Sequence, residues 1–306
     1  RALPEAFAEA PERQPYQHMR VWRGQPEQAL HFDADLLRIE ALGWIVPESR
    51  LRADLWQALP PDRRLSGVRL DTRTDHDDGV SLLLSDDSVV RCALVVACDG
   101  AGSPLRAAAG IPVHRWRYVQ GGLVAPLRTT QPHAETAWQR FCPDGSVVAL
   151  LPMADGRCSL VWSSPEAEML QQVPDAQFSA RLTDAVQGVL GDITVDGPRQ
   201  VFPLVAQHAE HYSGHRLVLA GDAAHTVHPL AGQGVNLGIA DHKRRENPQR
   251  VIARRHGQQL VVIAQVLEEG AALHLHLDPQ HQAFAAHQLE QFRIIADELL
   301  ETGFQA

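Results

Sequence analysis

Residues 217–238 limit the fold of this chain more than any other segment. Residues 217–220 are all apolar, as in a strand that is covered on both faces, and Gly221-Asp222 follows directly. In α/β sheets ligands bind at the carboxyl ends of strands, and a carboxylate placed there suits a sugar or polyol hydroxyl. Gly232-Gln233-Gly234 then opens a helix at about Val235, whose first amides can bind a phosphate or a developing negative charge. The segment therefore predicts an α/β sheet with a ligand site at its edge.

A second apolar strand, residues 95–97, ends in a similar way. Asp99-Gly100 follows it, and Ser103 leads into a helix that carries Arg106. Taken alone, Asp99-Gly100 is equally consistent with an ordinary turn. Beside the first motif, Asp99-Gly100 is expected to form the second side of one nucleotide-binding site. Arg106 then either belongs to that site or makes a salt bridge at the start of the helix.

The remaining chain alternates between short strands and helices. Period-two patterns predict a three-stranded meander at 65–70, 80–84 and 89–97, and further strands at 115–125, 136–142, 146–152 and 157–163. Period-four patterns predict helices at 50–59 (with Ser49 as cap), 165–190 and 249–269. This order indicates a mixed α/β fold with a substantial antiparallel sheet in its middle.

Charge and cysteine content exclude several functions. A formal net charge of −9 argues against nucleic acid, which needs a concentrated positive surface. The four cysteines form no C-x-x-C pair, and the histidines near residues 274–287 match no common metal spacing, so we expect reduced thiols and no metal site. No apolar run approaches ~18 residues. We expect a cytoplasmic protein.

The Gly-Asp segment resembles a known fingerprint. Gly221-Asp222-Ala223-Ala224-His225, followed by Pro229 and Gly-Gln-Gly-x-Asn-x-Gly, is similar to the second FAD motif of the p-hydroxybenzoate hydroxylase superfamily of flavin monooxygenases. Asp99-Gly100 with Ser103 and Arg106 resembles the Asp-Gly motif of the same family. The resemblance covers about residues 15–242.

Within the superfamily the chain is most similar to the ubiquinone-biosynthesis hydroxylases. The strings that carry this likeness are Pro-Leu-Ala-Gly-Gln-Gly-Val-Asn-Leu-Gly at 229–238, Met-Arg-Val-Trp at 19–22 and Leu-Gly-Trp-Ile-Val-Pro-Glu at 42–48. Trp-Gln-Arg-Phe at 138–141 and Ser-Leu-Val-Trp at 159–162 look most like a hydroxylase of a demethoxy-type quinol. The resemblance implies a prenylated aromatic or quinol substrate, partners in a quinone-biosynthesis assembly, and peripheral contact with a membrane.

The resemblance also implies the cofactors and their binding residues. FAD is reduced by NAD(P)H, reacts with oxygen and transfers a hydroxyl group to an electron-rich ring, so no catalytic side chain is assigned. Asp222 would bind the ribityl or ribose part of FAD, and Pro229 and His225 would lie near the flavin. The complete set of expected cofactor-binding residues is Asp99, Gly100, Arg106, Gly221, Asp222, Pro229, Gly232, Gln233, Gly234, Val235 and Asn236.

The family architecture predicts three regions in this chain. Residues 1–111 and 206–242 would form a doubly wound FAD-binding domain, 112–205 an antiparallel-sheet substrate domain, and 243–306 a C-terminal helical region. Five aromatic residues would line the substrate pocket, although they are equally consistent with a sheet core: Trp116, Tyr118, Trp138, Phe141 and Trp162.

One family feature is missing from residues 1–60. They contain Gly24 and Gly43, and neither follows a strand with the Gly-x-Gly-x-x-Gly spacing that holds the ADP half of FAD. We therefore expect the N-terminal dinucleotide-binding unit to be absent from this chain. Three functions stay open: an FAD-dependent quinol hydroxylase, an accessory or scaffold homologue that has lost FAD, and a flavin oxidoreductase that does not hydroxylate.

Overall fold

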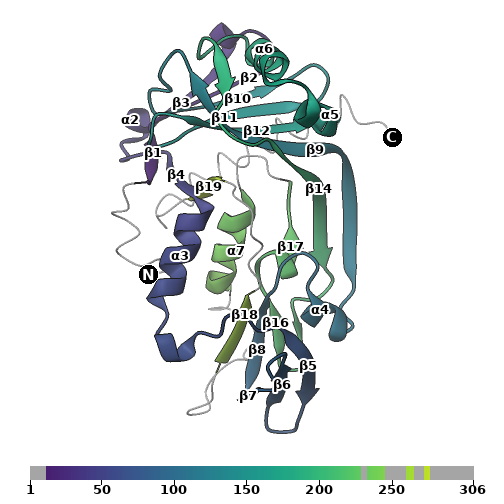
Figure 1. The fold of residues 1–306 in the computed structure, drawn as a ribbon. Coiled ribbons are helices and arrows are strands. Elements are labelled where there is room, and N and C mark those ends of the chain that lie inside the picture. Colours follow the sequence, from purple (N-terminus) through teal and green to yellow (C-terminus); the bar gives the residue numbers. More distant parts are fainter. Residues whose placement is uncertain (1–11, 229–232, 245–259, 265–271, 276–306) are drawn as a thin grey trace. The chain divides into compact units, whose positions relative to one another are not determined.

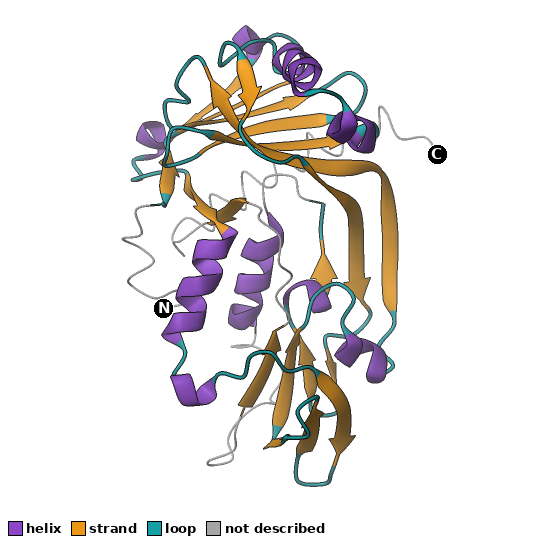
Figure 2. Ribbon diagram, viewed as in Figure 1, coloured by secondary structure: helices purple, strands orange, loops and turns teal. Residues whose placement is uncertain are grey.

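The computed structural model describes residues 12–228, 233–244, 260–264 and 272–275 (Figure 1). Strands outnumber helices among them, and the fold is mixed α/β, as expected (Figure 2). The chain divides into two compact units. Unit 1 comprises residues 1–13, 46–122 and 201–274, and unit 2 comprises 14–45, 123–200 and 275–306.

A small, mainly parallel sheet lies at the centre of unit 1. Its order is β15 (Ser213–Gly214), β16 (Leu217–Leu219), β8 (Leu94–Cys98) and β18 (Leu260–Ala264). β8 runs parallel to β16 on one side and to β18 on the other. Val95 and Leu217 are fully buried, which explains why both strands are apolar throughout.

The predicted meander is present, with different limits. It contains β5 (Leu70–Asp75), β6 (Val80–Leu84) and β7 (Val89–Cys92), paired antiparallel in that order. The predicted first strand at 65–70 was placed too early, and the predicted strand 89–97 is two strands. The chain leaves the meander at Ala93 and joins the parallel sheet, and an uninterrupted apolar run cannot reveal such a change of partner.

Unit 1 also contains short helices. They are α3 (Glu48–Ala58), η2 (Pro61–Arg63), α4 (Pro104–Ala108), η3 (Gly221–Ala223) and α7 (Gln233–Arg244). α3 begins at Glu48, one residue before the predicted cap Ser49, because Pro47 takes the capping position. Of the leucines that repeat along α3, Leu51 is buried and Leu55 is exposed, so only the first turn packs inward.

Most of the described strands of unit 2 belong to one large sheet. The order of the sheet is β17 (His225–Thr226), β14 (Gln200–Ala209), β9 (Val113–Thr129), β12 (Cys158–Ser164), β11 (Val147–Pro152), β10 (Thr136–Phe141), β2 (His18–Trp22) and β3 (Leu30–Asp33). β13 (Ile193–Val195) pairs with β9. The strands predicted between 115 and 163 are confirmed. Gly145 and Gly156 make the two tight turns with positive φ values of 81°, which glycine adopts without strain.

Residues 14–45 fall in unit 2 together with these strands, whereas the family architecture places them in the FAD-binding domain. β2 pairs parallel with β10 and antiparallel with β3. Asp33 at the end of β3 joins the two strands, since its carboxylate contacts His18 at 2.6 Å and Arg20 at 2.7 Å. Partial burial of Asp33 raises its pKa, but hydrogen bonds from His18 and Arg20 lower it by more. The pKa of Asp33 is therefore below the ordinary value.

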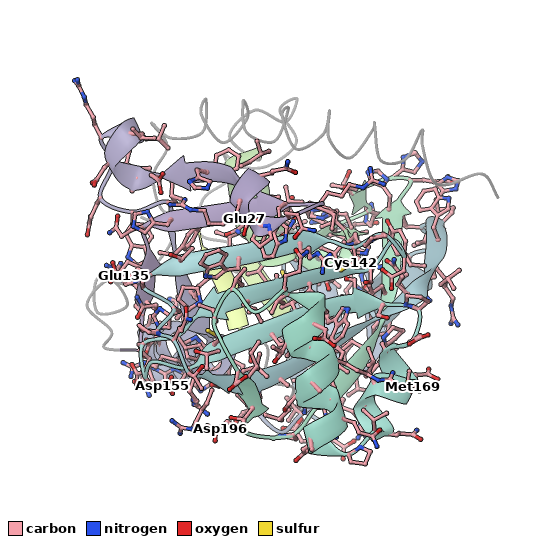
Figure 3. All side chains as sticks on the ribbon, turned by 90° about the horizontal axis from the view of Figure 1, so that it is seen from above. Glu27, Glu135, Cys142, Asp155, Met169 and Asp196 are labelled. Carbon is pink, nitrogen blue, oxygen red and sulfur yellow. The ribbon has the colours of Figure 1, made fainter. Side chains whose placement is uncertain are left out.

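Two helices cover one face of the sheet in unit 2, and both are visible on the same side of β10, β11 and β12 in Figure 1. In Figure 3, seen from above, the helices stand in front of the strands, and Met169 marks α5. A single helix was predicted over 165–190, but Pro174 divides it into α5 (Ala167–Gln172) and α6 (Asp175–Ala185). Phe178 and Leu182 of α6 are fully buried and form the core on this face.

Short elements complete the described chain. β1 (Gln14–Tyr16), β4 (Gly43–Pro47) and β19 (Ala272–Leu275) form a three-stranded sheet, and η1 (Pro26–Gln28) and α2 (Ala34–Leu37) flank β3. The prediction of a helix over 249–269 is wrong at 260–264, which is β18. The β-branched residues of this run pair along the edge of β8, and the remainder of the predicted helix lies outside the described residues.

All four cysteines are free thiols in the structure. None of the described helices is both long enough and apolar enough to span a membrane. Within the described parts of the chain, no three histidine, cysteine or acidic side chains are grouped as they would be around a metal ion. His276, His281 and His287 lie outside those parts.

Candidate functional site

The two predicted motifs lie at the same edge of the parallel sheet. β8 and β16 are paired in parallel from Val95 opposite Leu217 to Ala97 opposite Leu219, so their carboxyl ends lie next to each other. Asp99-Gly100 follows the first strand, and Gly221-Asp222 follows the second. Both glycines have positive φ values, 83° at Gly100 and 59° at Gly221, which other residues adopt only with strain. The turns therefore need glycine at these positions.

The buried side chain of Arg106 joins the two turns. Its guanidinium donates hydrogen bonds to the carbonyl oxygen of Ala223 at 2.7 Å and to that of Ala101 at 2.8 Å. Burial lowers the pKa of Arg106, the nearby Arg115 lowers it further, and Asp99 opposes both. Arginine stays protonated despite such shifts. Of the two interpretations of Arg106, these contacts favour a place in the site, because the side chain connects the turn after β8 with the turn after β16.

Gln207 on β14 makes a second link between the same turns. Its Nε2 donates to the carbonyl oxygens of Ala101 and Asp222, both at 2.9 Å, and its Oε1 accepts from Arg115 at 2.9 Å. The Gln207 residue is 2% exposed, so these bonds are shielded from water. The sequence did not indicate Gln207, because no local motif marks a side chain that bonds to the carbonyls of two distant segments.

Asp99 accepts a hydrogen bond from the first turn of α4 with one carboxylate oxygen, and its other oxygen has no partner among the described residues. Its Oδ2 accepts from the amide of Leu105 at 3.2 Å, while Ser103 Oγ caps the helix by accepting from the amide of Arg106 at 3.0 Å. The buried Oδ1 of Asp99 has no hydrogen-bond partner among the described residues. A buried carboxylate oxygen without a donor is costly, and a bound ligand with hydroxyl or amide groups would satisfy it.

Asp241 on α7 holds the Gly-Asp turn from the other side. Its carboxylate accepts from the Gly221 amide at 2.8 Å and contacts His225 Nε2 at 3.0 and 3.1 Å. Both Asp241 and His225 are buried. A Cβ atom on Gly238 would lie 3.1 Å from the Gly221 Cα, so helix and turn pack at backbone distance. His225 thus shapes the turn, as the motif suggested.

The sequence analysis missed the role of Asp241, although a signal for it was present. Gly234, Gly238 and Asp241 are spaced by four and then three residues, which places them on one face of α7. Two glycines and one carboxylate on a single face indicate a helix that packs closely against backbone and accepts a hydrogen bond from it.

Asp222 itself lies at the surface of η3. The residue is exposed, yet enough protein surrounds its carboxyl group that desolvation raises its pKa, while the nearby His225 works against the rise. No described residue donates a hydrogen bond to the Asp222 carboxylate. A partly desolvated carboxylate without a protein partner is suited to hydroxyl groups of a ligand.

The other predicted cofactor residues lie in or before the first turn of α7. Gln233, Gly234, Val235 and Asn236 form that turn, with Val235 exposed. Pro229 and Gly232 lie outside the described residues. The structure therefore brings Asp99, Gly100, Arg106, Gly221, Asp222 and His225 together.

The five aromatic residues expected in a substrate pocket do not form one group. Trp162 packs against Phe178 of α6, with ring centroids 6.1 Å apart, and Trp138 contacts Trp22 edge-on at 6.1 Å. For Trp138 and Trp162 the sheet-core interpretation holds. Trp116 and Tyr118 are exposed on β9 in unit 1.

His228, which follows β17, contacts Tyr118 of β9. The two rings meet edge-on, with centroids 4.7 Å apart. Desolvation lowers the pKa of His228, so its imidazole is neutral at pH 7.

Comparisons with known proteins identify the family of this chain. A family model described as an FAD binding domain matches residues 63–244. The chain is 38% identical over 232 residues to the 3-demethoxyubiquinol 3-hydroxylase of Escherichia coli (strain K12), covering 74% of this chain and 59% of that protein. It is 37% identical over 235 residues to the ubiquinone hydroxylase UbiL of Rhodospirillum rubrum, covering 75% and 54%.

A solved structure supports the fold. PqsL, a probable FAD-dependent monooxygenase from Pseudomonas aeruginosa, matches with a TM-score of 0.61 at 23% identity, over 76% of this chain and 67% of that one. The chain spans a little over half the length of the two curated relatives named above. The predicted likeness to the ubiquinone-pathway hydroxylases is confirmed, and the chain belongs to the FAD-binding-domain family of flavin monooxygenases.

Proposed function

We propose that this protein hydroxylates an electron-rich quinol ring in ubiquinone biosynthesis, using FAD, NAD(P)H and O2. The proposal rests mainly on the two turns that follow β8 and β16. Hydrogen bonds from Arg106 and Gln207 connect these two turns. Two acidic groups at these turns, Asp99 Oδ1 and the Asp222 carboxylate, lack donors among the described residues. The named relatives, a demethoxyubiquinol hydroxylase and a ubiquinone hydroxylase, support the substrate class.

The residues present fit FAD. Asp222 would accept hydrogen bonds from ribityl or ribose hydroxyls, and Asp99 Oδ1 would accept one from a further donor of the cofactor. The amides of Gly234 and Val235, in the first turn of α7, would stabilise negative charge on the phosphates or the flavin ring. Bound flavin supplies the redox chemistry and the activation of oxygen that side chains cannot provide.

The chain's own residues mainly bind and orient. Arg106 and Gln207 hold the two turns at a fixed separation, and Asp241 fixes the backbone of Gly221 and the imidazole of His225. Such preorganisation means that the carboxylates need not move when the cofactor binds. No side-chain nucleophile is required for this reaction class.

The Asp222 assignment is tested by flavin retention. The purified protein is incubated with FAD and desalted, and its visible absorbance is compared with that of Asp222→Ala and Asp222→Asn. Both variants are expected to lose the flavin bands. Because desolvation raises the pKa of Asp222, ionisation of this group is less favourable in the folded than in the unfolded chain, so Asp222→Asn should retain or gain stability without ligand. Unchanged flavin content in both variants would contradict the assignment.

Activity is tested by oxidation of NADH or NADPH in the presence of a short-chain demethoxyubiquinol analogue and labelled oxygen gas. Incorporation of labelled oxygen into the ring supports the hydroxylase. NAD(P)H oxidation without incorporation indicates a flavin oxidoreductase instead. A wild-type protein that remains colourless with FAD indicates a scaffold. Because a prenylated substrate partitions into lipid, we propose that the protein meets it at a membrane surface, which co-sedimentation with vesicles would test.

A further inference from the structure

Gln139, in the middle of β10, has a buried amide group without a partner. The residue is 4% exposed, and its Nε2 has no hydrogen-bond partner among the described residues. Leaving such a donor unpaired in the protein interior lowers the stability of the folded state. A polar group retained at this cost in the centre of a sheet calls for a functional explanation.

The two neighbours of Gln139 along β10 show which face of the sheet its side chain occupies. Arg140 donates to the carbonyl oxygen of Ala185 at the end of α6. Trp138 contacts Trp22, whose indole donates to Gln187 just after α6 at 2.7 Å. Since successive side chains of a strand point to opposite faces, Gln139 faces away from these helices.

Apolar side chains surround Gln139 on that face. The strand register places Val21 of β2 on one side and Ala149 of β11 on the other, and Val161 of β12 lies next to Ala149. Ala149 and Val161 are only half-buried. The nearest neighbours of Gln139 across the strands are thus apolar, and a polar group set among apolar ones is typical of small-molecule sites.

Other buried donors of unit 2 differ from this one, and Arg140 Nε, which also lacks a partner, lies on the face of the two helices. The indole N–H groups of Trp138 and Trp162 also lack partners within the described chain. Both lie on the opposite face, where Trp162 packs against Phe178 and core side chains fill the space. The unpartnered amide of Gln139 lies on the other face, next to the half-buried Ala149 and Val161.

We propose that Gln139 binds a ring oxygen of the quinol substrate, with Val21, Ala149 and Val161 against the ring and the start of its prenyl chain. A ring hydroxyl both donates and accepts hydrogen bonds, so it matches a carboxamide, which also does both. Gln139 is then a specificity-determining residue for the reaction proposed above, and this inference rests on that proposed function.

The test compares Gln139→Leu with a matched control, Gln171→Leu, in the FAD-loaded protein. Gln171 lies in the same unit and its Nε2 is satisfied by the carbonyl oxygen of Arg199 at 2.9 Å. Binding of a short-chain demethoxyubiquinol analogue is measured by calorimetry under nitrogen. We expect Gln139→Leu to weaken binding about tenfold, with an unchanged or higher melting temperature, since it removes an unpaired donor. Gln171→Leu should lower the melting temperature and leave binding unchanged.

A second ligand shows whether Gln139→Leu weakens binding by removing a hydrogen bond or by changing the shape of the side chain. An analogue with hydrogen in place of the ring hydroxyls should bind wild type and Gln139→Leu equally. A similar loss with both ligands, or a lower melting temperature for Gln139→Leu, would overturn the inference in favour of a structural role. Equal binding of the hydroxylated analogue by wild type and variant would overturn it while leaving the proposed function intact. Failure of flavin-loaded wild type to bind that analogue would refute the substrate class and the inference together.

Discussion

Replacing Asp241 with alanine is expected to destabilise the Gly-Asp turn strongly. The change leaves two buried groups without an acceptor, the Gly221 amide and the His225 imidazole, which now lie 2.8 and 3.0 Å from the carboxylate. Hydrogen bonds to a charged group contribute about 1.5–3 kcal/mol each, so the expected loss is about 3–5 kcal/mol. Asp241→Asn keeps the shape and one acceptor, and should cost about 1–2 kcal/mol.

The assay for Asp241 has two readouts. Urea denaturation gives the free energy of unfolding, and desalting after incubation with FAD gives flavin retention. Asp62, exposed on η2, provides the matched control, because an alanine there should change the free energy of unfolding by less than about 0.5 kcal/mol. We expect Asp241→Ala to lose flavin as well as stability, since Gly221 and Asp222 belong to one turn.

The reasoning would be refuted by an Asp241→Ala variant whose stability lies within about 0.5 kcal/mol of wild type. Such a result would mean that water or backbone relaxation replaces the carboxylate without cost. If Asp241→Ala lost stability but retained its flavin fully, Asp241 would stabilise the fold without contributing to cofactor binding. FAD binding would then not depend on the position of this turn.

Three further changes test other parts of the structure. Gly238→Ala brings a methyl group to 3.1 Å from the Gly221 Cα, so we expect a loss of about 1–3 kcal/mol in urea denaturation; unchanged stability would mean that α7 moves freely. The pKa of Asp33 in the folded protein lies below its ordinary value of 3.8. The ionised carboxylate therefore stabilises the folded protein above pH 3.8, and this stabilisation is lost as the pH falls through the pKa of the folded state. Asp33→Asn should therefore destabilise at pH 7 and have little effect at pH 2, and equal losses at both pH values would contradict this. Burial raises the pKa of Cys158 to about 12, so its thiol should resist iodoacetamide at pH 8 until the protein is denatured, as peptide mass spectrometry would show.

Local sequence predicted the parts of the site that depend on local backbone. Asp99-Gly100 and Gly221-Asp222 each follow an apolar strand, and strand, glycine and acid are consecutive in the chain. Because the carboxyl ends of parallel strands share one edge of a sheet, these patterns were enough to place both turns at that edge.

The connections between these turns could not be predicted in this way. Gln207 and Arg106 bond to carbonyl oxygens, and every residue has a carbonyl oxygen, so no sequence pattern marks the acceptor. β18 was taken for helix because its pairing with β8 depends on a strand far away in sequence. Tertiary pairing overrides local preference in such segments.

The position of β8 has a consequence for the order of folding. This strand pairs residue 95 with residue 217 on one edge and with residue 261 on the other. In the β5–β7 meander, by contrast, paired residues are no more than 14 positions apart. Closing such long loops is slow, so we expect the meander to form early and β8 to wait for its partners. During synthesis, the apolar β8 would leave the ribosome long before either partner and would be exposed to chaperones or to aggregation. The turns that prepare the cofactor site would then be among the last parts of the protein to take shape.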